Sequence, residues 1–168
     1  MTGSALIFDG VKAFADIAAL ECQAYNNAFV EAGLPWLWDA QTLASFGAIE
    51  DGAERIRLYA ADMQHDMTRM EVERLNEAVI RHFTSRASRF GVPLRAGIQN
   101  TISRARRDDR PVGLASRNAL APFIRLYNAP GLQLDALGMD VPAVARMLGT
   151  EHTDVVGQDQ PLRLVEAA

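Results

Sequence analysis

The sequence predicts an α/β fold in which a helical segment interrupts a parallel sheet, and three observations support this prediction. A short apolar run at residues 5–8 has the length and composition of a buried strand. Residues 13–90 show helical spacing of apolar positions and no strand pattern. A second apolar run at 111–116 then leads into a helical segment at 119–127. This order of elements is typical of a parallel sheet with helices packed on its faces.

The helical segment divides into several predicted helices. Apolar residues at a spacing of three to four predict a helix at 13–33, which ends at Gly33. Two short helices separated near Gly47 follow. The clearest helix spans 67–88, and its apolar residues form one stripe, namely Val72, Leu75, Val79, Ile80 and Phe83.

The second half of the chain returns to mixed structure. Residues 92–97 are predicted to form a loop and 98–108 an amphipathic helix. A further helix is predicted at 140–149 and a third strand at 153–158. Residues 161–168 have the composition of either a final strand or a frayed tail.

These elements group into two regions. Residues 1–14 and 91–168 are predicted to form the core, which is a truncated Rossmann-like parallel sheet. Residues 15–90 are predicted to form a helical subdomain inserted after the first strand.

The composition is that of an ordinary globular protein. The chain has 168 residues, of which 49% are hydrophobic and 23% charged, and this is enough to bury a core. Cys22 is the single cysteine, and no signal peptide is recognisable, so we expect a cytoplasmic location. No apolar stretch is long enough to span a membrane, and the net charge of −4 argues against nucleic-acid binding. We therefore expect neither membrane nor nucleic acid as a partner.

Two strand ends carry groups capable of chemistry. Asp9 follows the first strand and Ser116 ends the second. The carboxyl ends of parallel strands meet at one edge of a sheet, so both groups are expected to face the same crevice. A carboxylate that attacks phosphorus and a hydroxyl that binds a phosphate oxygen form a combination suited to phosphoryl transfer.

The segment "ALIFDGVKAFAD" (5–16) resembles the first motif of the haloacid dehalogenase superfamily, in which apolar residues precede D-x-D-G-T. The similarity continues through "ECQAYNNAFVEAGLPWLWD" (21–39) and resumes at "VPLRAGIQNTISRARRDDRPVGLASRN" (92–118). The latter resembles the second-motif region of capped sugar-phosphate phosphatases, such as phosphoglycolate phosphatase, β-phosphoglucomutase and Calvin-cycle sugar-bisphosphate phosphatases. The resemblance covers roughly residues 4–128 and implies that 15–90 form the cap.

The resemblance also implies roles for individual residues. Asp9 takes the place of the nucleophile, and Ser116 takes the place of the phosphate ligand in the second motif. Arg117 and Asn118 follow Ser116 and are expected to contribute to phosphate binding.

The first motif departs from the family pattern at three positions. The aspartate that acts as general acid and base, and that offers its carbonyl to magnesium, is replaced by Val11. Valine keeps the carbonyl but cannot transfer a proton. Lys12 stands in place of the family glycine, which permits a backbone geometry that lysine resists, and Ala13 in place of the threonine.

The later motifs are also incomplete. The family places a lysine after the second motif to neutralise the phosphate, but Lys12 is the single lysine of this chain. Lys12 and Arg163 are therefore the candidate substitutes for that cation. The acidic pair that binds magnesium has no convincing counterpart, because Asp154 and Asp159 occur in a different context.

These departures predict a catalytically degenerate protein that binds a protein partner or a phosphorylated small molecule, with no cofactor. Loss of the acid/base costs roughly 10²–10⁴ in rate, and loss of metal and cation removes electrostatic stabilisation. The alternative is a magnesium-dependent phosphatase of a small sugar phosphate that uses Asp9 as its nucleophile.

The expected partner follows from the predicted sheet. In the family the first strand is central, but its neighbour from the fourth motif is missing from the predicted elements, so residues 5–8 would become an edge. An apolar edge strand offers unpaired backbone groups to other chains. We therefore expect a homodimer or a protein partner to cover this edge, unless residues 161–168 fold back over it.

Overall fold

The structure is a computed structural model that describes residues 3–127 and 132–157. The chain forms two compact units. The core unit comprises Met1–Asp16, Val92–Arg117 and Asn128–Ala168. The helical unit comprises Ile17–Gly91 and Asn118–Tyr127. Residues 118–127 were expected in the core, whereas the structure places them in the helical unit.

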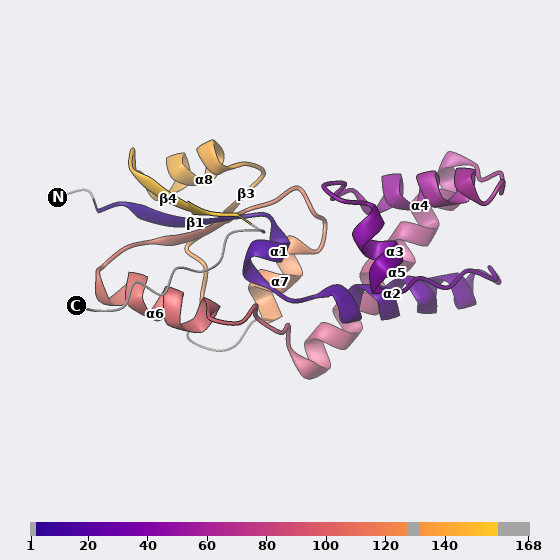
Figure 1. Cartoon of the computed structure of the whole chain (residues 1–168), viewed down its shortest axis with the longest axis horizontal. Helices are drawn as coiled ribbons and strands as arrows, with labels where there is room; N and C mark the ends of the chain where they lie inside the picture. Colours follow the sequence, from indigo (N-terminus) through magenta and orange to yellow (C-terminus); the bar gives the residue numbers. More distant parts are fainter. Residues whose placement is uncertain (1–2, 128–131, 158–168) are drawn as a thin grey trace. The chain divides into compact units, whose positions relative to one another are not determined.

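The core unit is built on a parallel sheet of four strands in the order β3-β2-β1-β4 (Figure 1). The strands are β1 (Ala5–Asp9), β2 (Val112–Ala115), β3 (Ala136–Gly138) and β4 (Thr153–Val156). The α/β class and the parallel sheet were both predicted correctly. The short strand β3 was not predicted, and residues 161–168 lie outside the described part of the chain.

Strand β1 is central in this sheet, so the expectation of an exposed first-strand edge was wrong. On one side Leu6 pairs with Val112 of β2, and on the other Ala5 pairs with Thr153 of β4. The segment 153–158 had been recognised as a strand but not as the neighbour of β1. Both edges of β1 are hydrogen-bonded within the chain, so β1 offers no exposed edge that a homodimer or another partner would need to cover.

One face of the sheet is covered by α8 (Val141–Leu148), and Figure 1 shows α6 (Ile98–Arg107) on the opposite side. The contact with α8 buries a cluster of small and branched side chains, namely Ala5, Ile7, Ala115, Ala136 and Val144. Ala5 and Ile7 share this face because alternate residues of a strand point the same way.

The predicted helix at 13–33 is interrupted. Helix α1 (Val11–Phe14) ends before α2 (Ala18–Glu31) begins. Between them Ala15 is extended and pairs in an antiparallel bridge with Leu94. The backbone N–H of Asp16 donates to the carbonyl of Pro93 over 3.0 Å. Tertiary pairing of the backbone therefore overrides the helical spacing of the apolar side chains.

The helical unit contains α2, α3 (Ala40–Ser45), α4 (Gly52–Asp62), α5 (Arg69–Phe90) and α7 (Ala121–Tyr127). Helix α5 begins at a capping box, in which Thr68 accepts from the backbone of Glu71 and the Glu71 side chain accepts from Thr68. Its buried stripe includes Val72, Leu75 and Val79, as predicted. Within the described residues, none of the helices is both long and apolar enough to cross a bilayer.

An aromatic cluster fills the interior of the helical unit. Trp38 is 1% exposed and contacts the rings of Tyr25, Phe29 and Tyr59 at centroid distances between 4.3 and 5.2 Å. Trp36 packs edge-on against Phe29 at 5.4 Å. The two tryptophans therefore belong to the core of this unit.

Replacement of Gly113 by alanine is expected to destabilise the core unit. A Cβ at Gly113 would lie 2.3 Å from Cγ1 of Val144, so α8 would have to move away from β2. We expect the free energy of unfolding to fall by about 1–3 kcal/mol, as is usual for overpacking. Urea denaturation measures this loss. The matched control is Gly157→Ala, where a Cβ would meet no described atom within 4 Å. Equal midpoints for the two variants would contradict the prediction.

A second stability prediction concerns Glu31, which joins α2 to α5. Arg81 donates two hydrogen bonds to its carboxylate over 3.1 and 2.8 Å, and Nε2 of His82 lies 2.7 Å away. These hydrogen bonds, first from Arg81 and then from His82, lower the pKa of Glu31 from 4.5 to about 2. The ionised group is thus favoured by folding. The contribution of ionised Glu31 to the free energy of unfolding is complete above pH 4.5 and is lost as the pH falls toward 2.

Glu31→Gln should therefore destabilise the protein at neutral pH. The difference in free energy of unfolding between the variant and wild type should shrink as the pH falls from 4.5 toward 2. Urea denaturation between pH 7 and pH 2.5 tests the effect. The control is Glu73→Gln, which removes an exposed pair with Arg69 on the same helix and should have little effect at any pH. A gap that is independent of pH would refute the prediction.

Candidate functional site

The site is centred on Asp9, the last residue of β1, whose side chain is exposed at the carboxyl edge of the sheet. Asp9 pairs with Ala115, so Ser116 follows directly on the neighbouring strand. On the other side Phe8 pairs with Val156. The structure thus places Asp9 and Ser116 at the same edge, as the sequence predicted.

The turn after Asp9 is made by Gly10, a residue that sequence analysis did not single out. Gly10 has a φ of 90°, which glycine adopts readily and other residues rarely adopt, and its N–H donates to the carbonyl of Ala115 over 2.7 Å. The glycine after a strand-ending aspartate was the available signal. Lys12 lies in α1 and has a negative φ, so the expected backbone strain at this position is absent.

The three predicted phosphate-binding residues differ in their surroundings. Ser116 is 9% exposed, and its backbone N–H donates to the carbonyl of Gly138 over 2.8 Å. Arg117 is exposed. Asn118 belongs to the helical unit, where its side-chain oxygen accepts from Leu120 over 2.9 Å at the start of α7. The structure thus places Ser116 and Arg117 in the unit that contains Asp9.

Of the three substituted positions of the first motif, two are buried and one is partly exposed. Val11 is 2% exposed and Ala13 is fully buried, while Lys12 is partly exposed. Among the described residues Lys12 forms no ion pair with Asp9 within 4 Å. Lys12 therefore remains a candidate cation only through its proximity in sequence. Arg163, the other candidate, lies outside the described residues.

The described residues show no cluster of metal-binding side chains at this edge. No group of three His, Cys, Asp or Glu side chains that could hold a metal occurs in the described part of the chain. The Val11 carbonyl, which the resemblance would offer to the metal, accepts the N–H of Ala15 over 2.8 Å. Asp159 lies outside the described residues.

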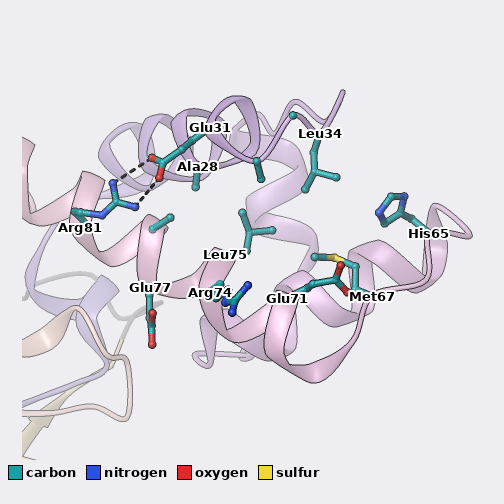
Figure 2. Close-up of a pocket in the computed structure, with 13 residues that line it drawn as sticks. Ala28, Glu31, Leu34, His65, Met67, Glu71, Arg74, Leu75, Glu77 and Arg81 are labelled. Carbon is teal, nitrogen blue, oxygen red and sulfur yellow. Dashed lines mark hydrogen bonds and ion pairs between the residues drawn. The ribbon is translucent and has the colours of Figure 1, made fainter.

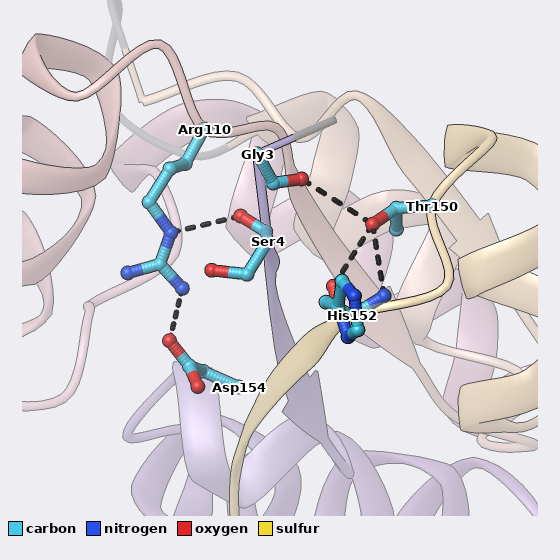
Figure 3. A network of polar contacts seen from close by, with 6 residues as sticks. All are labelled: Gly3, Ser4, Arg110, Thr150, His152 and Asp154. Atoms are coloured by element: carbon cyan, nitrogen blue, oxygen red, sulfur yellow. Dashed lines mark hydrogen bonds and ion pairs between the residues drawn. The ribbon is translucent and has the colours of Figure 1, made fainter. Parts of the chain in front are cut away.

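Asp154 is occupied elsewhere. It pairs with Arg110, whose Nε also donates to the carbonyl of Ser4 over 2.8 Å (Figure 3). Ser4 precedes β1 and Asp154 lies early in β4, so this ion pair sits at the amino ends of the strands. Asp154 is therefore not a ligand at the edge that carries Asp9.

The helical unit has a groove of about 730 Å³ between α2 and α5. Figure 2 shows Glu31 bound to Arg81 at one end of the groove, with His65 and Met67 toward the other. Two of its three acidic groups serve the fold, since Glu31 joins two helices and Glu71 caps α5. We therefore assign no chemistry to this groove.

The helical unit also buries an ion pair that sequence analysis did not predict. Arg55 and Glu21 are 3% and 1% exposed, and Nη1 of Arg55 lies 3.3 Å from Oε1 of Glu21. Burial raises the pKa of the neighbouring Tyr25 to about 12 despite the opposing charge of Arg55. A buried pair of this kind is costly to break, because one charge would remain without its partner.

The sequence is similar to two curated proteins. Over 130 residues the chain is 33% identical to the plasmid-encoded protein CbbY of Cupriavidus necator, covering 74% of this chain and 51% of the relative. It is 24% identical to the protein CbbY of Cereibacter sphaeroides, covering 69% of this chain and 50% of the relative. The chain thus spans about half the length of these curated relatives. No protein-family model matches the sequence.

Solved structures show the same fold. CbbY from Rhodobacter sphaeroides, crystallised with xylulose-1,5-bisphosphate, superposes with a TM-score of 0.75 at 19% identity, covering 90% of this chain and 76% of that one. The β-phosphoglucomutase of Clostridium difficile gives a TM-score of 0.70 at 16% identity, covering 90% and 74%. Together with the first-motif strand, the position of Ser116 and the helical insert, the sequence similarity to CbbY shows that the chain belongs to the haloacid dehalogenase superfamily, whose fold the solved structures share.

Proposed function

We propose that this protein is a phosphomonoester hydrolase of a small sugar phosphate, with Asp9 as its nucleophile. The observation that carries the proposal is the exposed carboxylate of Asp9 at the end of β1, beside the strand that leads into Ser116. Support comes from CbbY of Rhodobacter sphaeroides, a similar structure that was crystallised with a sugar bisphosphate and with phosphate.

The reaction has two steps. An oxygen of the Asp9 carboxylate attacks phosphorus, and the bond from phosphorus to the leaving oxygen breaks, so that an aspartyl phosphate and an alkoxide form. The hydroxyl of Ser116 donates to a phosphate oxygen and holds the group in line. Water then attacks the aspartyl phosphate, which returns Asp9 and releases inorganic phosphate.

Proton transfer limits this reaction. The resemblance assigns the acid/base role to position 11, but Val11 carries no proton and its side chain is buried. The leaving oxygen must therefore depart without protonation by this residue. A stable leaving anion, such as an aryl oxide, departs readily without a proton, whereas a sugar alkoxide departs more slowly.

The second candidate function is binding of a phosphorylated small molecule without turnover. The presence of valine at position 11 favours it, because the same two strand ends would hold a phosphate group even if the first step never occurred. The two candidates share the site and differ only in whether the bond to the leaving group breaks.

An aryl phosphate should be hydrolysed, and a sugar phosphate should react roughly 10²–10⁴ times more slowly, since that is the usual contribution of a general acid. Release of aryl alcohol and of inorganic phosphate measures both rates. Asp9→Asn should abolish the activity, whereas Asp16→Asn, which changes another exposed aspartate of the core unit, should leave it unchanged. Phosphate binding without any aryl phosphate turnover would instead establish the second candidate.

Magnesium is expected to leave the melting temperature unchanged, because the described residues supply no adequate ligand set. A ligand raises the melting temperature only by binding the native state. Differential scanning fluorimetry with increasing magnesium chloride, and with calcium chloride as a control for ionic strength, provides the measurement. A saturable shift specific to magnesium would show that ligands outside the described residues complete a metal site.

A further inference from the structure

The backbone of Arg95 is fixed beside the first motif. Residues 93–95 run antiparallel to 14–16, where Ala15 pairs with Leu94. The N–H of Arg95 donates to the carbonyl of Phe14 over 3.0 Å, at the end of α1. The start of the Arg95 side chain is therefore anchored to the helix that immediately follows Asp9.

The guanidinium of Arg95 reaches the carboxyl edge of the sheet. Its Nη1 lies 3.4 Å from the carbonyl oxygen of Gly157, the residue after β4. Phe8 pairs with Val156, so the next residues, Asp9 and Gly157, lie side by side at the ends of adjacent strands. The guanidinium therefore lies at the carboxyl edge of the sheet, at the end of the strand that neighbours β1.

From this placement we propose that Arg95 is the cation that binds the ligand phosphate at this edge. The inference rests on the proposed function, because it requires a phosphate group at Asp9. A guanidinium carries several N–H donors in one plane, so it can hold a carbonyl oxygen and a phosphate oxygen together. Its positive charge also offsets the repulsion between the Asp9 carboxylate and an incoming phosphate.

Arg95 supplies what the two cations expected from the sequence do not provide in the described structure. Lys12 makes no ion pair with Asp9, and Arg163 lies outside the described residues. Arg95 was overlooked because it precedes the second motif, whereas the family's lysine follows it. The position of Arg95 at the carboxyl edge of the sheet follows only from its contact with Gly157 and from the pairing of β4 with β1.

Arg110 provides a matched control within the same unit. It also binds a backbone carbonyl next to the sheet, that of Ser4, but it does so at the amino ends of β1 and β4 (Figure 3). A purely structural arginine and a phosphate-binding arginine can therefore be compared on the same strand pair.

Isothermal titration calorimetry with inorganic phosphate tests the proposal, with thermal unfolding recorded for every variant. Arg95→Gln keeps a donor for the Gly157 carbonyl but removes the charge, and it should weaken phosphate binding about tenfold or more. Arg95→Lys restores the charge and should recover most of the affinity. Arg110→Gln should lower the melting temperature and leave the phosphate affinity unchanged.

The outcomes separate this inference from the proposed function. If wild type shows no saturable phosphate binding, both fail. If wild type binds phosphate and Arg95→Gln binds it equally well, the role of Arg95 is refuted and the proposed function stands. Equal losses of affinity in Arg95→Gln and Arg110→Gln would likewise refute the role, because a general loss of stability would then account for both.

Discussion

The parallel pairing of β1 with a strand on each side is the constraint on which the core unit depends. It fixes Ala115, Asp9 and Gly157 in a row at the carboxyl edge, because registers on both flanks are set by backbone hydrogen bonds. The same pairing brings residues from three distant parts of the sequence to one edge. The candidate chemistry of the chain is thus a consequence of sheet register more than of any local motif.

The order of elements in the core could be predicted from local pattern, but the position of β4 could not. The apolar runs at 5–8 and 111–116 identified two strands because both are buried on two faces. Strand β4 has Thr153, Val155 and Val156 as strand formers, but its place beside β1 depends on the chain returning after α8. Long-range pairing of this kind leaves little trace in a single sequence, and the mistaken edge strand followed from it.

The candidate site was predictable to a similar degree. Asp9 and Ser116 were found because each ends a recognisable strand. Gly10 and Arg95 were not found, since the role of Gly10 depends on a positive φ and that of Arg95 on a contact with a residue 62 positions away. The buried pair of Glu21 with Arg55 was not predicted, because charged residues in helices ordinarily face solvent.

The burial of Val11 and Ala13 has a consequence for how this sequence can change. Both side chains now form part of the packed interior beneath α1. Aspartate at position 11 would place a carboxylate in that interior, and threonine at position 13 would add volume at a fully buried position. Each of these single changes would therefore cost stability, which opposes a return of acid/base chemistry at this position.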